Sequence, residues 1–198
     1  MRVIRAANYQ AVPWKNGLGT THEILKHPES VEDFIYRLSI AEVTQSCAFS
    51  AFPGYDRTIT LLDGDGFELR FADGGTHALD SRHAPFHFDG GMSVSCTVTG
   101  GPSKDLNLMV RREAARADCG MLEMAGRLTL PPVPGATRLI VALAEGITVR
   151  DSDQAAALGR WDTVCIEMSN GPADETICES AGAALFFHAL VTPRAGAA

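Results

Sequence analysis

Short stretches of β-branched or alternating apolar residues recur along the whole chain, and each is closed by glycine, proline or aspartate. Stretches of this length, separated by turn residues, are typical of the strands of an all-β sandwich or barrel. The clearest are 34–41, 57–62, 66–72, 92–99, 137–144, 163–168 and 183–192. We therefore expect an all-β fold.

One segment has the pattern of a helix instead. Ser103 can cap residues 104–117, in which Leu106, Met109 and Val110 would fall on one side. We expect this helix to link two β lobes, an N-terminal one at residues 1–117 and a C-terminal one at residues 118–198.

Two similar segments support the two-lobed organisation. Residues 58–64 (TITLLDG) resemble residues 140–146 (IVALAEG), and Leu79-Asp80 matches Trp161-Asp162 at the same offset of 82 residues. A shared offset favours an internal duplication. Each copy predicts a strand, an acidic-glycine hairpin turn and a second strand.

Composition excludes several partners. The 198 residues include 17 Lys and Arg against 24 Asp and Glu, a formal net charge of −7, and no basic run that would bind nucleic acid. The longest apolar stretch, 181–191, is too short to span a bilayer, and no signal peptide is evident at the N-terminus. Five cysteines without a Cys-x-x-Cys pair indicate reduced thiols. We expect a cytoplasmic protein with no membrane partner.

The turn at residues 63–66 resembles that of small cupin-type barrels, in which a His-x-His-x(3 or 4)-Glu run upstream binds a metal ion. Here Ser50 and Phe52 stand where the histidines would, and Arg57 stands where the glutamate would. An arginine next to a cation is unfavourable, whereas its planar fork suits a carboxylate. The sequence therefore predicts a pocket for an acid, with no metal and no cofactor.

Four segments carry a closer resemblance. They are 13–24 (PWKNGLGTTHEI), 37–41 (RLSIA), 49–57 (FSAFPGYDR) and 105–112 (DLNLMVRR). Together they closely resemble the HutD/Ves family. The resemblance implies a metal-independent bicupin whose N-terminal barrel binds a small carboxylated metabolite, for which N-formylglutamate has been suggested in members associated with histidine utilisation. The chain departs from the family pattern at Leu18 and Gly91.

Candidate ligand contacts begin in the loop that precedes Gly17 and Gly19. Trp14, Lys15 and Asn16 can present an indole, an ammonium and an amide to one cavity, although Trp14 could instead simply plug the barrel mouth. On the strand that follows, alternation places Thr21 and Glu23 on one face.

Two arginines are the expected anion clamp. Arg37 and Ser39 share a strand face, so Arg37 either reaches into the pocket or pairs with Glu42 or Asp56 at a strand edge. Arg57 has the same two readings, and its position relative to the turn favours ligand contact. The full set of expected ligand contacts is Trp14, Lys15, Asn16, Thr21, Glu23, Arg37, Ser39, Phe49, Phe52 and Arg57.

Three functions fit these residues. Binding without turnover is the principal prediction, with a small carboxylated metabolite as the partner and a homodimer as a further possibility. A cofactor-independent isomerase or lyase is the alternative, with Glu23 as general base and Lys15 as acid. A purely structural module, with a filled barrel, is the third. Asn107 is expected to brace the lobe, and the loop histidines His77, His83 and His87 are expected to be solvated rather than metal ligands.

Overall fold

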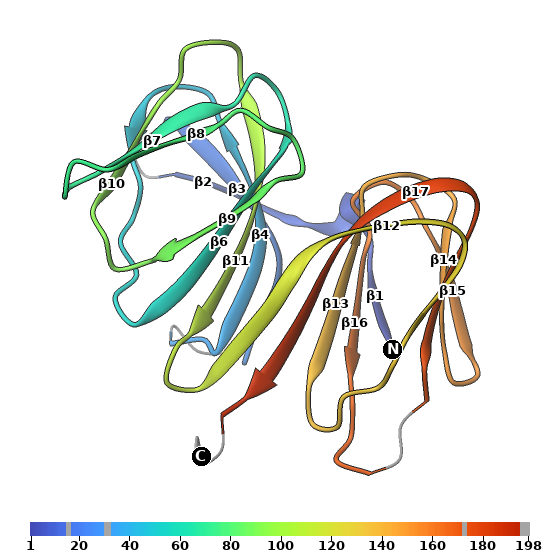
Figure 1. Ribbon diagram of the computed structural model, residues 1–198. Helices are drawn as coiled ribbons and strands as arrows, with labels where there is room; N and C mark the ends of the chain where they lie inside the picture. The colour runs from blue at the N-terminus through green and yellow to red at the C-terminus, as the bar shows by residue number, and fades with distance from the viewer. Residues whose placement is uncertain (15–16, 30–32, 172–173, 195–198) are drawn as a thin grey trace. The chain divides into compact units, whose positions relative to one another are not determined.

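Strands account for most of the chain in the computed structural model, which describes residues 1–14, 17–29, 33–171 and 174–194 (Figure 1). Within these ranges the helical structure consists of one 3-10 turn, η1 (Ala6–Asn8). No helix in the described ranges has the length and apolar character needed to cross a membrane. The all-β prediction is confirmed, and each of the seven predicted stretches overlaps a strand.

The chain divides into two compact units, and the division differs from the expected one at the N-terminus. The N-terminal unit is Gln10–Ala115, and the C-terminal unit combines Met1–Tyr9 with Arg116–Ala198. The break after Ala115 lies close to the predicted boundary at residue 117. The first nine residues, however, belong to the C-terminal unit, because β1 (Arg2–Ile4) pairs with β16 (Thr163–Glu167).

The N-terminal unit consists of two antiparallel sheets. The larger has the strand order β2-β3-β4-β11-β6-β9, and the smaller has the order β5-β10-β7-β8. Their bounds are β2 (Gln10–Pro13), β3 (Gly19–His27), β4 (Tyr36–Val43), β5 (Cys47–Ala48), β6 (Tyr55–Asp63), β7 (Phe67–Phe71), β8 (Thr76–Leu79), β9 (Pro85–Asp89), β10 (Val94–Thr97) and β11 (Ser103–Arg111).

Side chains of both sheets form the core of this unit. Val43, Ile59 and Leu61 of the larger sheet belong to one buried cluster with Phe67 and Leu69 of β7. The central strands β4, β6 and β11 are buried over nearly their whole length on both faces. A strand of this kind loses the alternation of apolar and polar residues that usually identifies it.

This loss explains why the predicted linking helix was wrong. The segment is β11, which lies between β4 and β6 in the larger sheet. Asp105, Asn107 and Met109 alternate onto one face and are all buried. Polar residues among apolar ones were interpreted as the exposed side of an amphipathic helix. In the structure the side chains alternate between the two faces of a strand, with a period of two residues.

The C-terminal unit is built on one sheet with the order β1-β16-β13-β17-β14-β15, and β12 pairs with β17. The remaining bounds are β12 (Ala115–Leu130), β13 (Thr137–Ala142), β14 (Ile147–Asp151), β15 (Gln154–Leu158) and β17 (Thr176–Pro193). Its core includes Ile140, Val164 and Phe186, which are fully buried.

The two similar segments occupy corresponding places, at the ends of β6 and β13. The predicted hairpin at residues 63–66 is nevertheless wrong, because β6 belongs to the larger sheet and β7 to the smaller. The turn is a corner between sheets. Gly64 is needed there because its φ is +92° and a Cβ atom would collide with the backbone carbonyl of Pro102.

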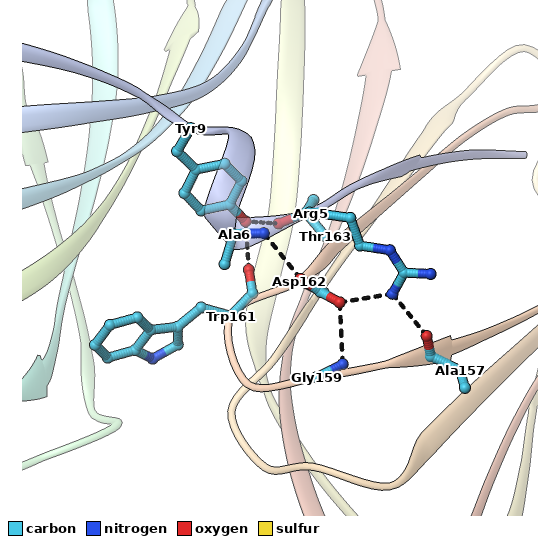
Figure 2. A network of polar contacts seen from close by, with 8 residues as sticks. All are labelled: Arg5, Ala6, Tyr9, Ala157, Gly159, Trp161, Asp162 and Thr163. Atoms are coloured by element: carbon cyan, nitrogen blue, oxygen red, sulfur yellow. Dashed lines mark hydrogen bonds and ion pairs between the residues drawn. The ribbon is translucent and has the colours of Figure 1, made fainter.

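Asp162 attaches the N-terminal segment to the C-terminal unit (Figure 2). Its carboxylate accepts hydrogen bonds from Arg5 Nη1 at 2.7 Å, from the Ala6 backbone N–H at 2.8 Å and from the Gly159 backbone N–H at 3.0 Å. Burial alone would raise the pKa of Asp162, but these donors and the Arg5 charge hold that pKa below its ordinary value.

The aromatic ring at the end of the same segment adds a second attachment. Tyr9 Oη lies 2.8 Å from Thr163 Oγ1 and also donates to the carbonyl oxygen of Trp161, as Figure 2 shows. Burial raises the pKa of Tyr9 above its ordinary value. The phenol therefore stays protonated and can keep donating at any physiological pH.

We predict that Asp162→Ala destabilises the protein by about 2–3 kcal/mol, because two backbone N–H groups and Arg5 lose a charged acceptor. Urea unfolding monitored by circular dichroism measures this change. Asp80→Ala is the matched control, since Asp80 occupies the corresponding turn but is exposed. Because the folded pKa is depressed, the Asp162 contribution should be present above about pH 4 and lost as the pH falls further. Equal effects of the two substitutions would contradict the attachment.

Candidate ligand-binding site

A cavity of about 580 Å³ lies in the N-terminal unit. Its volume falls within the roughly 300–1,000 Å³ of small-molecule pockets. Seven of the predicted contacts line it, namely Trp14, Thr21, Arg37, Ser39, Phe49, Phe52 and Arg57. Sequence reasoning missed the remaining lining residues, Val12, Pro13, Ala41, Ala48, Ser50, Asn107 and Met109.

Strand register brings the two arginines to the same cavity. Met109 of β11 lies opposite Arg37 of β4 on one side and opposite Arg57 of β6 on the other. Residues directly opposite one another in a sheet share a face, and two strand spacings separate the arginine backbones by roughly 10 Å. Both guanidinium groups therefore extend over the same part of the sheet.

The Arg57 guanidinium is enclosed on its faces and partly hydrogen-bonded at its edge. The side chain lies beneath Phe49 and Phe88, whose ring centroids are 4.9 and 5.4 Å from Cζ. Arg57 Nε and Nη2 donate to Asn107 Oδ1 at 2.9 and 2.6 Å. Burial lowers the pKa of Arg57 to about 10, with the Asp105 charge opposing the shift. The group is therefore still charged at neutral pH.

Arg37 has a similar aromatic enclosure and fewer hydrogen bonds. Its Cζ lies 5.3 Å from the ring centroid of Phe34 and 5.2 Å from that of Phe52. Nη2 approaches Met109 Sδ at 3.8 Å, and the buried Nε has no acceptor among the residues that the structure describes. Burial lowers the pKa of Arg37, and the negative charge of Glu23 opposes this. An unsatisfied buried donor costs about 1–3 kcal/mol, which a ligand oxygen would recover.

The structure resolves the alternative that Arg37 pairs with an acid at a strand edge. Glu42 lies 3.9 Å from Lys104, and Asp56 accepts a hydrogen bond from Arg112 at 2.7 Å. Within the described ranges neither Arg37 nor Arg57 has a carboxylate oxygen within 4.0 Å. Both charges therefore remain available to an anion in the cavity.

Behind Arg57 lies a buried carboxyl group that sequence reasoning did not single out. Asn107 Nδ2 donates to Asp105 Oδ2, while Asp105 Oδ1 has no partner in the described part of the chain. Asp105 is 0% exposed. Burial raises the pKa of Asp105 to about 7, although the Arg57 charge and the Asn107 hydrogen bond oppose the shift. The alternation of residues 105, 107 and 109 was the signal that would have placed it here.

The other predicted contacts have different outcomes. Trp14 closes one wall, with Nε1 donating to Thr21 Oγ1 at 2.8 Å and its ring edge-on to Phe49. Glu23 lies opposite Ser39 in the sheet but does not line the cavity, and it acts on Arg37 only through its charge. Lys15 and Asn16, which were also predicted contacts, lie outside the described residues.

The histidines and cysteines of this unit pack locally. His77 stacks on Phe86 with ring centroids 3.6 Å apart, and His87 Nδ1 lies 2.8 Å from Thr58 Oγ1. In the ranges that the structure covers, no three His, Cys, Asp or Glu side chains gather as a metal site. Burial raises the pKa of Cys47 to about 12, so its thiol is protonated at neutral pH and is not a nucleophile.

Comparison with known sequences gives a family and two informative relatives. A family model described as HutD matches residues 6–186. A Pseudomonas putida protein, described as an uncharacterized 21.2 kDa protein in the hutC 3' region, is 34% identical over 169 residues, which cover 84% of this chain and 87% of the relative. Protein Ves of Citrobacter koseri is 44% identical over 105 residues, or 52% of this chain and 54% of that protein.

Solved structures agree with the sequence comparison. A conserved protein of unknown function from Pseudomonas aeruginosa PAO1 has a TM-score of 0.87 and 32% identity, covering 98% of both chains. HutD from Pseudomonas fluorescens SBW25, solved in a formate condition, has a TM-score of 0.81 and 30% identity over 98% of both chains. A cupin 2 conserved barrel domain protein from Leptotrichia buccalis, 9% identical with a TM-score of 0.59 over 96% of this chain and 100% of that one, shows that the fold is of the cupin type.

We predict that Asn107→Ala destabilises the protein by about 2–4 kcal/mol, because it leaves two Arg57 donors and the Asp105 carboxyl without their buried partner. The midpoint of urea unfolding measures this effect. Ser39→Ala is the matched control, since Ser39 is a buried polar residue of the same cavity, lies opposite Asn107 and should cost less than about 1 kcal/mol. An Asn107 variant as stable as the Ser39 variant would show that this row of contacts does not stabilise the fold.

Proposed function

The chain belongs to the HutD/Ves family of cupin-fold proteins, and from that premise we propose that it binds a small carboxylated metabolite in the cavity of its N-terminal unit. The ligand resembles N-formylglutamate, and its binding serves histidine utilisation, in keeping with the HutD name and with the hutC-region relative.

One observation carries the proposal, which is that two arginines, Arg57 buried and Arg37 half-buried, line one cavity and have donors that are not used within the described residues. Two phenylalanine rings lie within 5.4 Å of each guanidinium carbon, so each group has aromatic neighbours as well as the cavity. Arg37 Nε is buried without an acceptor among the described residues, and the hydrogen bonds recorded for Arg57 in the same ranges use Nε and Nη2 but not Nη1. An arginine edge matches the two oxygens of a carboxylate, and a charge-assisted hydrogen bond is about twice as strong as a neutral one.

The spacing of the arginines favours an acid with more than one acceptor group. Because their backbones are roughly 10 Å apart, a single carboxylate could reach both forks only where the side chains converge. A glutamate-sized diacid can place one carboxylate on each fork. An N-formyl group adds a third acceptor oxygen, and the cavity of about 580 Å³ holds a molecule of that size.

The positions of the carboxyl groups favour binding without turnover. Glu23, the general base of the enzymatic alternative, does not line the cavity. Asp105 is the carboxyl group with a raised pKa, but it lies behind Asn107 and also does not line the cavity. A general base must come within hydrogen-bond reach of the proton that it removes.

We predict that N-formyl-L-glutamate raises the melting temperature of the metal-stripped protein. At 100 times the Kd the ligand adds about 2.7 kcal/mol, or roughly 5–10 °C for a chain of this size. Arg57→Lys and Arg37→Lys should each weaken binding by about 10- to 150-fold, because lysine keeps the charge but loses the fork. Differential scanning fluorimetry with increasing ligand, for each variant, measures these shifts.

Arg112→Lys is the control for this experiment, since Arg112 is an arginine of the same unit that is half-exposed and already paired with Asp56 and Asp89. It should leave the ligand-induced shift unchanged. The proposal would be wrong if glutamate, N-formyl-L-glutamate, urocanate and formate all gave no shift. It would be equally wrong if the Arg57 and Arg37 variants shifted as much as the unmodified protein.

A further inference from the structure

The Asp105 carboxyl group has an arrangement that a structural ion pair would not require. A direct pair would bring a carboxylate oxygen against Arg57, but Asn107 lies between the two and accepts from one while donating to the other. The second carboxylate oxygen, Oδ1, is buried without a partner in the described residues. A buried ionised carboxylate with an unpaired oxygen is costly, and protonation removes that cost.

The hydrogen bonds that link Arg57, Asn107 and Asp105 all run in one direction, and this direction determines which Arg57 donors are left for a ligand. Asn107 must present its Oδ1 to the two Arg57 donors, so its amide nitrogen must point to Asp105. The acceptor at Asp105 therefore selects the amide orientation that fixes the Arg57 fork. What remains for a ligand is Nη1 and the second proton of Nη2 of this cavity-lining residue.

Charge balance in the cavity changes when an anion binds. In the empty site above about pH 7, where Asp105 is ionised, its charge offsets that of Arg57, and the charge of Glu23 opposes that of Arg37. An anion held by Arg57 adds a negative charge on the other side of Asn107 from Asp105. Two negative charges in a buried site repel one another, and the cheaper state has one of them protonated.

The groups that face Asp105 cannot supply that proton themselves. Arg57 of β6 is a cation, with Arg37 of β4 beyond it. From the smaller sheet comes the Cys47 thiol of β5, whose pKa the Asp105 charge helps to raise, and Cys47 in turn contacts Cys96 of β10 at 3.6 Å. Because burial raises the pKa of Cys47 to about 12, its thiol does not release a proton near neutral pH, so the proton comes from solvent.

We propose that Asp105 is a positioning residue of the anion site, which fixes the Arg57 fork through Asn107 and takes up one proton from solvent when a carboxylate binds to Arg57. This inference rests on the proposed function, because it needs an anion in the cavity. Starting from the site with Asp105 ionised, the protein takes up one anion and one proton and releases nothing. Binding is therefore tighter at low pH, and the raised pKa of Asp105, about 7, places the change near neutrality.

The first test measures the affinity for N-formyl-L-glutamate by isothermal titration calorimetry between pH 6 and pH 8.5. The Kd should rise by roughly tenfold between pH 7 and pH 8.5, and buffers of different ionisation enthalpy should report an uptake of about half a proton at pH 7 that approaches one proton at pH 8.5. Asp105→Asn keeps the shape and an acceptor oxygen for Asn107 but cannot titrate, so its Kd should not change with pH. Asp63→Asn, at a half-exposed acid of the same unit, should keep the pH dependence.

The second test needs no ligand and separates this inference from the proposed function. In ¹³C and ¹⁵N NMR spectra, the Asp105 carboxyl signal should titrate near pH 7, and the Arg57 Nε signal should move with the same midpoint in the unmodified protein but not in Asp105→Asn. If N-formyl-L-glutamate fails to bind at every pH while this titration is present, the ligand proposal fails and the coupling of Asp105 to Arg57 stands. An Asp105 signal that titrates below pH 5, or a Kd with the same pH dependence in Asp105→Asn, would overturn the inference.

Discussion

Burying the Arg57 charge is the constraint on which the N-terminal site depends. A guanidinium group inside a protein needs acceptors for its donors and a counter-charge nearby. Asn107 supplies the acceptor, Asp105 supplies the charge, and both come from the central strand β11. The rings of Phe49 and Phe88 lie within 5.4 Å of the guanidinium carbon. The result is a fork whose open edge is fixed in direction.

A buried arginine in the C-terminal unit, Arg138, provides a contrast in how its donors are satisfied. Arg138 is 2% exposed, and its donors meet Thr176 Oγ1 at 2.6 Å, His188 Nε2 at 3.3 Å and the carbonyl oxygens of Leu130 and Pro131. Protein atoms satisfy nearly all its donors. Arg37, by contrast, leaves a buried Nε without an acceptor in the described residues, which is why the N-terminal cavity is the candidate site.

Sequence reasoning identified β4 and β6 as strands although both are buried on both faces, and it failed on β11, where buried polar residues alternate with apolar ones. Alternation placed Thr21, Arg37 and Ser39 correctly on the cavity side, and the missing metal ligands led to Arg57. The same reasoning took β11 for a helix, so Asn107 was expected only to brace the lobe and Asp105 was overlooked. Pairing of the first residues with β16 is a contact across more than 150 positions, which no local pattern reveals.

The central claim is that a ligand carboxylate binds to the two arginines of the cavity. A crystal structure of the complex with N-formyl-L-glutamate tests this claim most directly. The account predicts carboxylate oxygens roughly 3 Å from Arg37 Nε and from Arg57 Nη1, with Asn107 still between Arg57 and Asp105. A ligand bound elsewhere, or a carboxylate that avoids both guanidinium edges, would contradict it.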